Sequence, residues 1–328
     1  MRVLLTGGAG FIGHHIVEHI LKKTNWEIVL LDRLDLSGNL NRVANVINEN
    51  IGKYQKRIKW IYHDFRAPIS YLTARLIEDV ELVLHVGAST HVDRSIVDPV
   101  SFVHDNVVGT ANILEFMRRY QARSTMIYFS TDEVFGPAAD GVAFKEWDRY
   151  KSGNPYAATK AGAEELCLAF ANTYDLDIRI THCMNVFGER QHREKFIPLV
   201  MHNSIFGKKT LIHANKDKTK AGSRFYIHAR NVADAVLFVY QHGKKGDKYN
   251  IVGSEEVDNL TLALMIAKIV GNPLTYELVD FHSSRPGHDL RYALSGKKMK
   301  SMGWEPPVDF GASLEKTVRW TMEHLEWL

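Results

Sequence analysis

The sequence predicts an α/β protein built on a doubly wound parallel sheet, with a smaller lobe formed by the C-terminal segments. Apolar runs typical of buried strands alternate with helical patterns through the first half of the chain. This is the pattern expected when helices cover both faces of a parallel sheet. After about residue 184 the alternation becomes irregular and resumes only at 230–252. The 328 residues suffice for one long domain or two closely packed ones.

The individual elements follow from the spacing of the apolar residues. Strands are predicted at 2–5, 27–32, 58–62, 81–86, 125–130 and 177–182. Long helices are predicted at 11–23, 101–119 and 155–174. The lysine-rich stretch 208–223 is predicted to be an exposed loop. We expect a first domain formed by 1–184 and 229–258, and a lobe formed by 185–228 and 259–328.

The composition excludes several classes of function. The net charge is only +3, with 45% hydrophobic and 24% charged residues, which fits a globular protein that binds no nucleic acid. No apolar run approaches the roughly 18 residues of a membrane span. Two cysteines, Cys167 and Cys183, cannot form a disulfide framework, so a cytoplasmic location is expected. The 16 histidines form no HExxH motif and there is no cysteine cluster, so we expect no metal site.

A glycine-rich segment follows the first predicted strand and opens the first helix. Gly7, Gly10 and Gly13 have the spacing GxxGxxG. The first glycine allows a tight turn, the second lets backbone amides approach a pyrophosphate, and the third lets helix and strand pack closely. The helix N-terminus adds partial positive charge. A purely structural turn can have the same sequence, so the motif gains weight only from its context.

Asp32 supplies that context. It ends the second predicted strand, 19 residues after Gly13. A carboxylate there can accept hydrogen bonds from an adenosine ribose and repel a 2′-phosphate, so the segment predicts a Rossmann dinucleotide site for NAD rather than NADP. Arg33 is a complication, because an arginine could accommodate that phosphate. Asp64, after the third predicted strand, is either an adenine contact or an ordinary loop acid.

Two further clusters carry groups suited to acid–base chemistry. Tyr156 and Lys160 lie four residues apart and share a helix face. The ammonium is expected to lower the pKa of the tyrosine and prepare it to act as a general base. Thr131, Asp132 and Glu133 follow a predicted strand, at the edge where open parallel sheets bind ligands. Adjacent carboxylates can divide acid and base roles, although such a pair can also cap a helix.

These motifs resemble the extended short-chain dehydrogenase/reductase superfamily and, more narrowly, the dTDP-glucose 4,6-dehydratases. The matching segments run nearly end to end: TGGAGFIG at 6–13, SGNL at 37–40, HVDRS at 91–95, DNVVGT at 105–110, STDEVFG at 130–136, PYAATK at 155–160, KFIPL at 195–199 and RPGHD at 285–289. The glycine and YxxxK motifs mark only the superfamily. The Thr-Asp-Glu triplet and the RPGHD segment are more specific.

The resemblance implies a reaction on a nucleoside-diphosphate hexose, with dTDP-glucose favoured and NAD tightly held. Thr131 hydrogen-bonds the sugar near O4, and Tyr156 takes the O4 proton with the support of Lys160. NAD takes up a hydride from C4 and returns it to C6. The 4-ketone acidifies the C5 proton, so Glu133 can remove it while Asp132 protonates the departing C6 hydroxyl.

The resemblance also implies binding residues. Those for the cofactor are Gly7, Gly10, Phe11, Ile12, Gly13, Asp32, Asp64, Phe65, Asn106, Tyr156 and Lys160. Those for the substrate are Thr90, His91, Asn185, Lys195, Arg224, Arg285 and His288. Arginine suits a diphosphate because its planar fork donates two parallel hydrogen bonds, although a surface ion pair is the usual fate of a single arginine. His91 is equally compatible with a structural role.

Several departures from the family pattern leave the nucleotide and the exact hexose open. Asn185-Val186 replaces two consecutive asparagines, Tyr226 replaces a tryptophan, and the segment before Arg224 is longer and richer in lysine. UDP, CDP and GDP sugars therefore remain alternatives to the dTDP sugar.

Other functions on the same scaffold also remain open. They are 4-epimerisation, decarboxylation of a uronic acid, and NAD binding without catalysis. An epimerase needs Tyr156 and Lys160 but no acid–base pair, so the Thr-Asp-Glu triplet favours the dehydratase. The family also implies a homodimer formed through the two long helices, which Leu166, Leu168 and Phe170 would allow.

Overall fold

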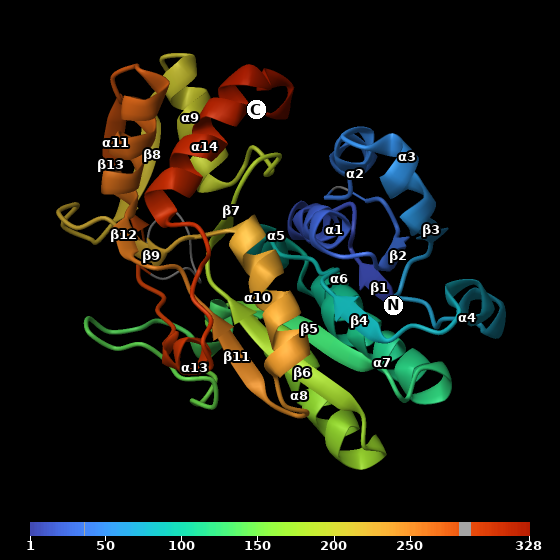
Figure 1. The fold of residues 1–328 in the computed structure, drawn as a ribbon. Coiled ribbons are helices and arrows are strands. Elements are labelled where there is room, and N and C mark those ends of the chain that lie inside the picture. The colour runs from blue at the N-terminus through green and yellow to red at the C-terminus, as the bar shows by residue number, and fades with distance from the viewer. Residues whose placement is uncertain (36, 282–289) are drawn as a thin grey trace.

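The structure, a computed structural model, describes residues 1–35, 37–281 and 290–328, and its centre is a seven-stranded parallel sheet (Figure 1). The strand order is β11-β6-β5-β4-β1-β2-β3, and every pairing in this sheet is parallel. The strands are β1 (Arg2–Thr6), β2 (Glu27–Asp32), β3 (Ile58–Tyr62), β4 (Leu82–His85), β5 (Thr125–Thr131), β6 (Asp177–Cys183) and β11 (Lys248–Ile251). Because all run the same way, their carboxyl ends share one edge, where open α/β sheets bind ligands.

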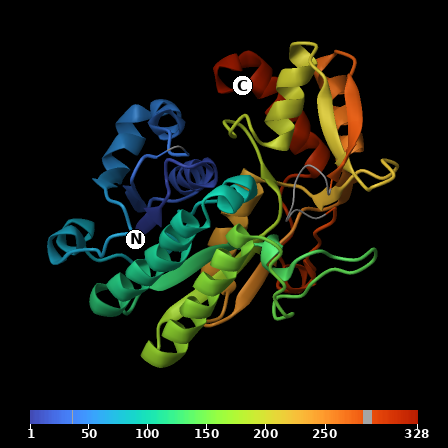
Figure 2. The same ribbon diagram turned by 180° about the vertical axis from the view of Figure 1, so that it is seen from behind.

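Helices cover both faces of this sheet. Figure 1 shows α1 (Phe11–Lys23) and α10 (Ala229–His242) on one face, and Figure 2 shows α7 (Gly109–Tyr120) and α8 (Pro155–Tyr174) on the other. The strands serve both layers because alternate side chains point to opposite faces. On β1, Val3 and Leu5 belong to the core under α1 and α10, whereas Leu4 belongs to the core under α7 and α8.

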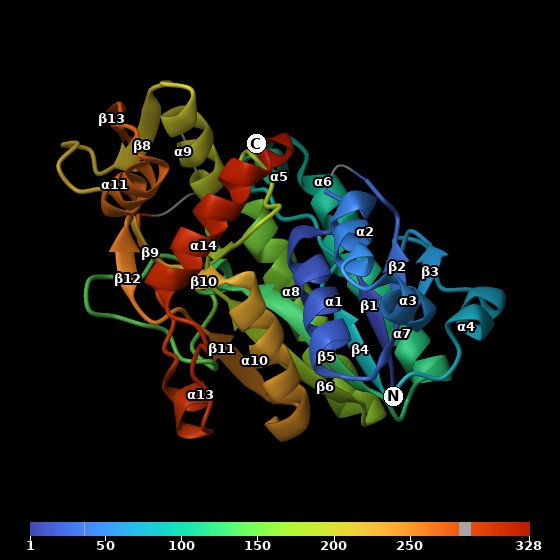
Figure 3. The ribbon, with the colours of Figure 1, turned by 45° about the horizontal axis from the view of Figure 1, so that its top comes forward.

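A smaller lobe lies beyond the carboxyl edge of the sheet (Figure 3). Its elements are α9 (Phe196–Ile205), β8 (Thr210–Ala214), β9 (Ser223–Phe225), β12 (Glu256–Asp258), α11 (Asn259–Val270), β13 (Tyr276–Asp280) and α14 (Phe310–Glu323). They share a core that includes Val200, Leu262 and Leu314. Two short strands, β7 (Val186–Phe187) and β10 (Ile227–His228), pair with each other in the crossings between sheet and lobe. The domain boundaries given above stay a prediction.

The remaining elements are short. They are α2 (Leu40–Asn48), α3 (Ile51–Tyr54), η1 (Gln55–Arg57), α4 (Tyr71–Ile77), α5 (Val92–Val97), α6 (Pro99–Phe102), η2 (Val103–Val108), η3 (Asp132–Phe135), α13 (Lys297–Ser301) and η4 (Leu325–Trp327). Within the described ranges, no helix has the length and apolar character needed to span a membrane.

Two predicted elements need correction. The helix expected at 101–119 is α6, a π-helical segment η2 and α7 in succession. The stretch 208–223 is not a single loop, because Thr210–Ala214 forms β8 and pairs in parallel with β13. Its buried positions Thr210, Ile212 and Ala214 alternate as a half-buried strand requires, but the surrounding lysines obscured this pattern.

Candidate active site

The glycine-rich segment forms a tight turn between β1 and α1. Gly7 has a φ of +71°, and a Cβ on it would lie 2.7 Å from the Cα of Gly87. A Cβ on Gly13 would lie 2.1 Å from the carbonyl oxygen of Gly7. Gly10 is the N-cap of α1, with Phe11 and Ile12 in its first turn. Only glycine permits this approach of the chain to itself, which leaves the amides at the helix start accessible to a phosphate.

The carboxylate of Asp32 stabilises this turn through hydrogen bonds to the backbone. It accepts hydrogen bonds from the backbone N–H of Ala9 (3.0 Å) and of Leu34 (2.9 Å). The turn is also held by the buried guanidinium of Arg42, which was not predicted and which donates to the carbonyl oxygens of Ala9 and Ser37. An arginine inside a short helix looks like a surface residue, so only the fold could reveal this contact.

The other expected cofactor contacts line the same edge. Phe65 is buried, and a Cβ on Gly87 would lie 2.8 Å from its ring, so the ring packs directly on the backbone after β4. Asp64 is held by the Arg66 guanidinium at 2.8 Å. Asn106 is 1% exposed, and its amide donates to the carbonyl oxygen of Ser89 (3.0 Å) and to the hydroxyl of Thr159 (2.9 Å). Asn106 therefore joins the β4 loop to helix α8, and its contact with a cofactor stays a prediction.

Tyr156 and Lys160 lie in the first two turns of α8, which begins with Asn154 as N-cap and Pro155 as the first helical residue. Both side chains are buried. The ammonium of Lys160 lies 4.2 Å from the centre of the Tyr128 ring, and it makes no hydrogen bond to any residue that the structure describes. Since a buried ammonium without acceptors is costly, this group fits the ribose hydroxyls of a bound dinucleotide. Burial also lowers the pKa of Lys160 to about 8.

The expected effect of Lys160 on the tyrosine is wrong for the free protein. Burial, followed by the charge of Glu133, raises the pKa of Tyr156, with only the side chain of Thr131 acting strongly in the opposite direction. Burial and, after it, the charges of the nearby carboxylates therefore determine the direction of this pKa shift in the free protein. Any protonation of Asp132 or Glu133 would relieve the tyrosine of this repulsion.

Asp132 and Glu133 follow β5 in the short helix η3, which is capped by Thr131 rather than by either acid. Burial raises the pKa of Asp132 to about 6, and burial together with the charge of Asp132 raises that of Glu133 to about 7. Near neutral pH the pair therefore holds about one proton between its two members.

Hydrogen bonding distinguishes the two acids. Oε2 of Glu133 accepts a hydrogen bond from the amide of Asn154 at 2.9 Å, which favours the ionised form that a base requires. Oδ2 of Asp132 is buried without a hydrogen-bond partner among the described residues, and such an oxygen is best accommodated when it carries the proton. The hydrogen bonds thus suit Glu133 as base and Asp132 as acid. The pKa values of the free pair, about 6 for Asp132 and about 7 for Glu133, instead place the shared proton on Glu133, so the proposed roles require a bound substrate to reverse this order.

Two of the predicted substrate residues, Arg224 and Lys195, lie near this pair. The positive charges of Arg224 and Lys195 both act on Glu133, and Lys195 also acts on His91. The Nη1 of Arg224 donates to the carbonyl oxygens of Ser223 (2.7 Å) and Leu290 (2.6 Å), so backbone contacts orient its fork. His91 lies 3.6 Å from Glu194. Thr90 and Asn185 are exposed, and Arg285 and His288 lie outside the described residues.

Behind the site is a buried network that the sequence did not predict. Glu164, one turn after Lys160, is fully buried and accepts hydrogen bonds from Ser130, Tyr150 and Nε2 of His182. An acid four residues after a lysine looks like an exposed helical ion pair, so no local signal pointed to it. The network fixes the end of β5 against α8, and hence the spacing between the Asp132–Glu133 pair and the Tyr156–Lys160 pair.

The doubly wound sheet, the glycine turn, and a Tyr–Lys pair beside two carboxylates define the class: an extended short-chain dehydrogenase/reductase. Within it, the chain belongs to the GDP-mannose 4,6 dehydratase family, whose family model matches residues 4–317. It is 34% identical to a dTDP-glucose 4,6-dehydratase of Salmonella typhimurium, over 100% of this chain and 94% of that protein.

Solved structures give the same result. DesIV from Streptomyces venezuelae, a dTDP-glucose 4,6-dehydratase with NAD and TYD bound, has a TM-score of 0.89 and 34% identity, covering 100% of this chain and 98% of its own. A UDP-glucose 4-epimerase of Thermus thermophilus in complex with NAD has a TM-score of 0.84 and 27% identity, covering 97% and 98%. The fold is therefore shared by dehydratases and epimerases, and the site residues must separate the two activities.

Proposed function

We propose that this chain is an NAD-dependent nucleoside-diphosphate-hexose 4,6-dehydratase that acts in the cytoplasm and converts dTDP-glucose into dTDP-4-keto-6-deoxyglucose. The observation that carries the proposal is the buried Asp132–Glu133 pair beside Tyr156, because a reaction limited to C4 needs no second acid–base pair. Relatives of this name that match the whole chain support the choice of dTDP-glucose.

The first half of the reaction is carried by α8. Tyr156 accepts the O4 proton of the sugar, and Thr131, whose side chain interacts with the tyrosine, orients that hydroxyl. The ammonium of Lys160 stabilises the phenolate as it forms and binds the nicotinamide ribose. Bound NAD, held by the glycine turn and Asp32, supplies the hydride acceptor at C4 and the hydride donor at C6.

The second half is carried by η3. Once C4 is a ketone, the C5 proton becomes acidic enough for the carboxylate of Glu133 to remove. Asp132 donates its proton to the C6 hydroxyl, which leaves as water. When C6 of the resulting C5=C6 double bond accepts the returned hydride, C5 takes back a proton from Glu133. Exchange with solvent then removes the O4 proton from Tyr156 and returns a proton to Asp132, which restores the starting state.

The proposal is tested by incubating the purified protein with dTDP-, UDP-, CDP- and GDP-glucose and following the products by mass spectrometry. We expect loss of one water, 18 mass units, from dTDP-glucose, and a product that absorbs light in strong alkali as a 4-keto-6-deoxy sugar does. An isomer of unchanged mass would instead identify an epimerase, and no turnover of any sugar would contradict the proposed function.

We also propose that two copies of the chain form a dimer through the helices at the α8 side of the sheet. Val97, Val100 and Val103 lie on α5, α6 and η2, which pack against α8, and they are 86%, 63% and 43% exposed. Neighbouring exposed valines are unusual on a monomer and fit a self-complementary interface.

The dimer is tested by light scattering during size-exclusion chromatography. We expect the mass of a dimer for the wild type and of a monomer for Val100→Asp, because a buried unpaired carboxylate disrupts an apolar interface. Leu72→Asp is the matched control, since Leu72 is 73% exposed on α4. A monomeric wild type, or a dimeric Val100→Asp, would contradict the proposed interface.

A further inference from the structure

Arg33 follows Asp32 directly, where its guanidinium would be expected to attract the 2′-phosphate of NADP. We propose that Asp105 is a second determinant of coenzyme choice, which excludes NADP by occupying Arg33. This inference rests on the proposed function only in that a dinucleotide binds at the glycine turn.

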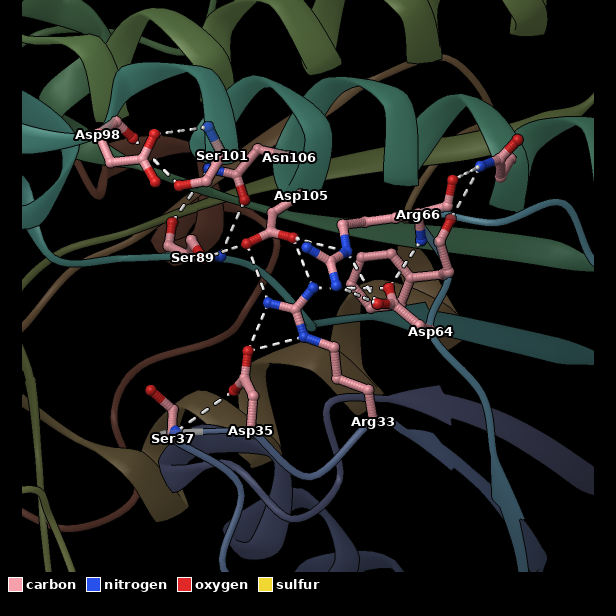
Figure 4. Close-up of polar contacts among 12 residues, drawn as sticks. Arg33, Asp35, Ser37, Asp64, Arg66, Ser89, Asp98, Ser101, Asp105 and Asn106 are labelled. Atoms are coloured by element: carbon pink, nitrogen blue, oxygen red, sulfur yellow. Dashed lines mark hydrogen bonds and ion pairs between the residues drawn. The ribbon is translucent and has the colours of Figure 1, made fainter.

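The contact between the two residues is a bidentate ion pair. Nη1 of Arg33 donates to Oδ1 of Asp105 at 2.6 Å, and Nη2 donates to Oδ2 at 2.9 Å (Figure 4). This is the fork geometry with which arginine binds carboxylate or phosphate. The third nitrogen, Nε, donates to Asp35 at 2.7 Å. All three nitrogens of the guanidinium are therefore directed at carboxylates, and the fork that a phosphate would use is taken.

Asp105 is held firmly in this position. Its side chain is only 6% exposed, and the hydroxyl of Ser89 donates a hydrogen bond to it at 2.6 Å. If Arg33 turned away towards a phosphate, the buried carboxylate would keep only Arg66, whose Nε lies 3.7 Å from Oδ1, as a counter-charge, which is costly. The other acids near Arg33 are less constrained, since the side chain of Asp35 is 45% exposed and that of Asp64 is 31% exposed.

The ion pair lies at the edge of the sheet that carries the glycine turn. In the sheet, β2 and β4 flank β1 on either side. Arg33 follows β2, Asp105 lies in η2 after β4, and the glycine turn follows β1. The pair thus spans the carboxyl end of β1, beside the position where Asp32 would meet the adenosine ribose.

The balance of charge at this position also opposes a 2′-phosphate. Four carboxylates, those of Asp32, Asp35, Asp64 and Asp105, lie here with three guanidinium groups, those of Arg33, Arg66 and Arg42 (Figure 4 draws all but Asp32 and Arg42). Asp32 alone would repel a 2′-phosphate less strongly than Asp32 and Asp105 together. Both oxygens of Asp32 already accept hydrogen bonds from backbone N–H groups, and its neighbour in sequence, Arg33, is a cation. Asp105 neutralises that cation, so the negative charge of Asp32 dominates.

The experiment measures which dinucleotide the purified protein retains. The protein is incubated with equal NAD and NADP, freed of unbound nucleotide and denatured, and the released nucleotides are quantified by mass spectrometry. For Asp105→Asn we expect the ratio of NADP to NAD to rise about tenfold over the wild type, the effect of one charge-assisted contact. Asp35→Asn, which removes an equal charge from Arg33 but leaves the fork occupied, is the matched control and should change the ratio less.

A double variant tests whether Arg33 is the group released. Arg33→Gln combined with Asp105→Asn should return the ratio to near the wild-type value. An unchanged ratio in Asp105→Asn, or an equal rise in Asp35→Asn, would overturn the inference. Circular dichroism confirms that each variant is folded, and Asp105→Ser replaces Asp105→Asn if that variant does not fold. A wild type that retains neither dinucleotide would instead refute the cofactor part of the proposed function.

Discussion

Replacing Tyr156 with phenylalanine is expected to lower kcat by roughly 10²–10⁴-fold, the usual contribution of a positioned acid–base group. The substitution removes only the hydroxyl, so the ring keeps its packing against Phe102 and the helix keeps its place. Retention of NAD by the purified variant should be unchanged, because the glycine turn, Asp32 and Lys160 remain. Turnover of dTDP-glucose and the amount of bound NAD are the two measurements.

The control for this prediction is Tyr240→Phe. Tyr240 lies on α10, where its ring contacts Trp26 on the opposite side of the sheet from α8. The loss of that hydroxyl should leave kcat near the wild-type value. If Tyr156→Phe turned over at the wild-type rate, the tyrosine could not be the base at O4. The phenol would then stay protonated during turnover, as the high pKa caused by burial and Glu133 favours.

The main features of the fold could be predicted because they depend on local patterns. The strand and helix that flank the glycine turn, Arg2–Thr6 and Phe11–Lys23, are set by an apolar run and an apolar stripe that can be read directly. β8 was missed because its partner, β13, lies more than 60 residues further along the chain, and the local sequence between Lys208 and Lys220 is dominated by charge. Its strand state depends on that distant pairing.

The same division applies to the site. Thr131, Asp132 and Glu133 are adjacent in sequence, and Tyr156 and Lys160 share one helix face, so their chemistry could be inferred before the fold was known. The groups that position them are linked over long separations. Arg33 meets Asp105 72 residues later, and Ser130 meets Glu164 34 residues later. Nothing local to Asp105 or Glu164 indicates a buried ion pair, since each looks like a solvated helix residue.

Replacing Glu133 with glutamine is expected to leave C4 oxidation intact and to lower the rate of water loss by roughly 10²–10⁴-fold. The glutamine carbonyl can still accept the hydrogen bond from Asn154, so the side chain keeps its place but can no longer remove the C5 proton. The direct measurement is deuterium uptake at C5 in heavy water, together with the loss of 18 mass units from the sugar. Both should fall in the variant.

Asp132→Asn is the informative comparison, because it removes the acid and leaves the base. We expect deuterium uptake at C5 to persist in this variant while water loss falls, so the two substitutions separate proton removal from departure of the hydroxyl.

In the wild type, the rate of water loss should pass through a maximum between the pKa values of the pair, about 6 and about 7. Below this range both acids are protonated and no base remains, and above it both are ionised and no acid remains. If Glu133→Gln exchanged C5 as fast as the wild type, the base would have to be another group.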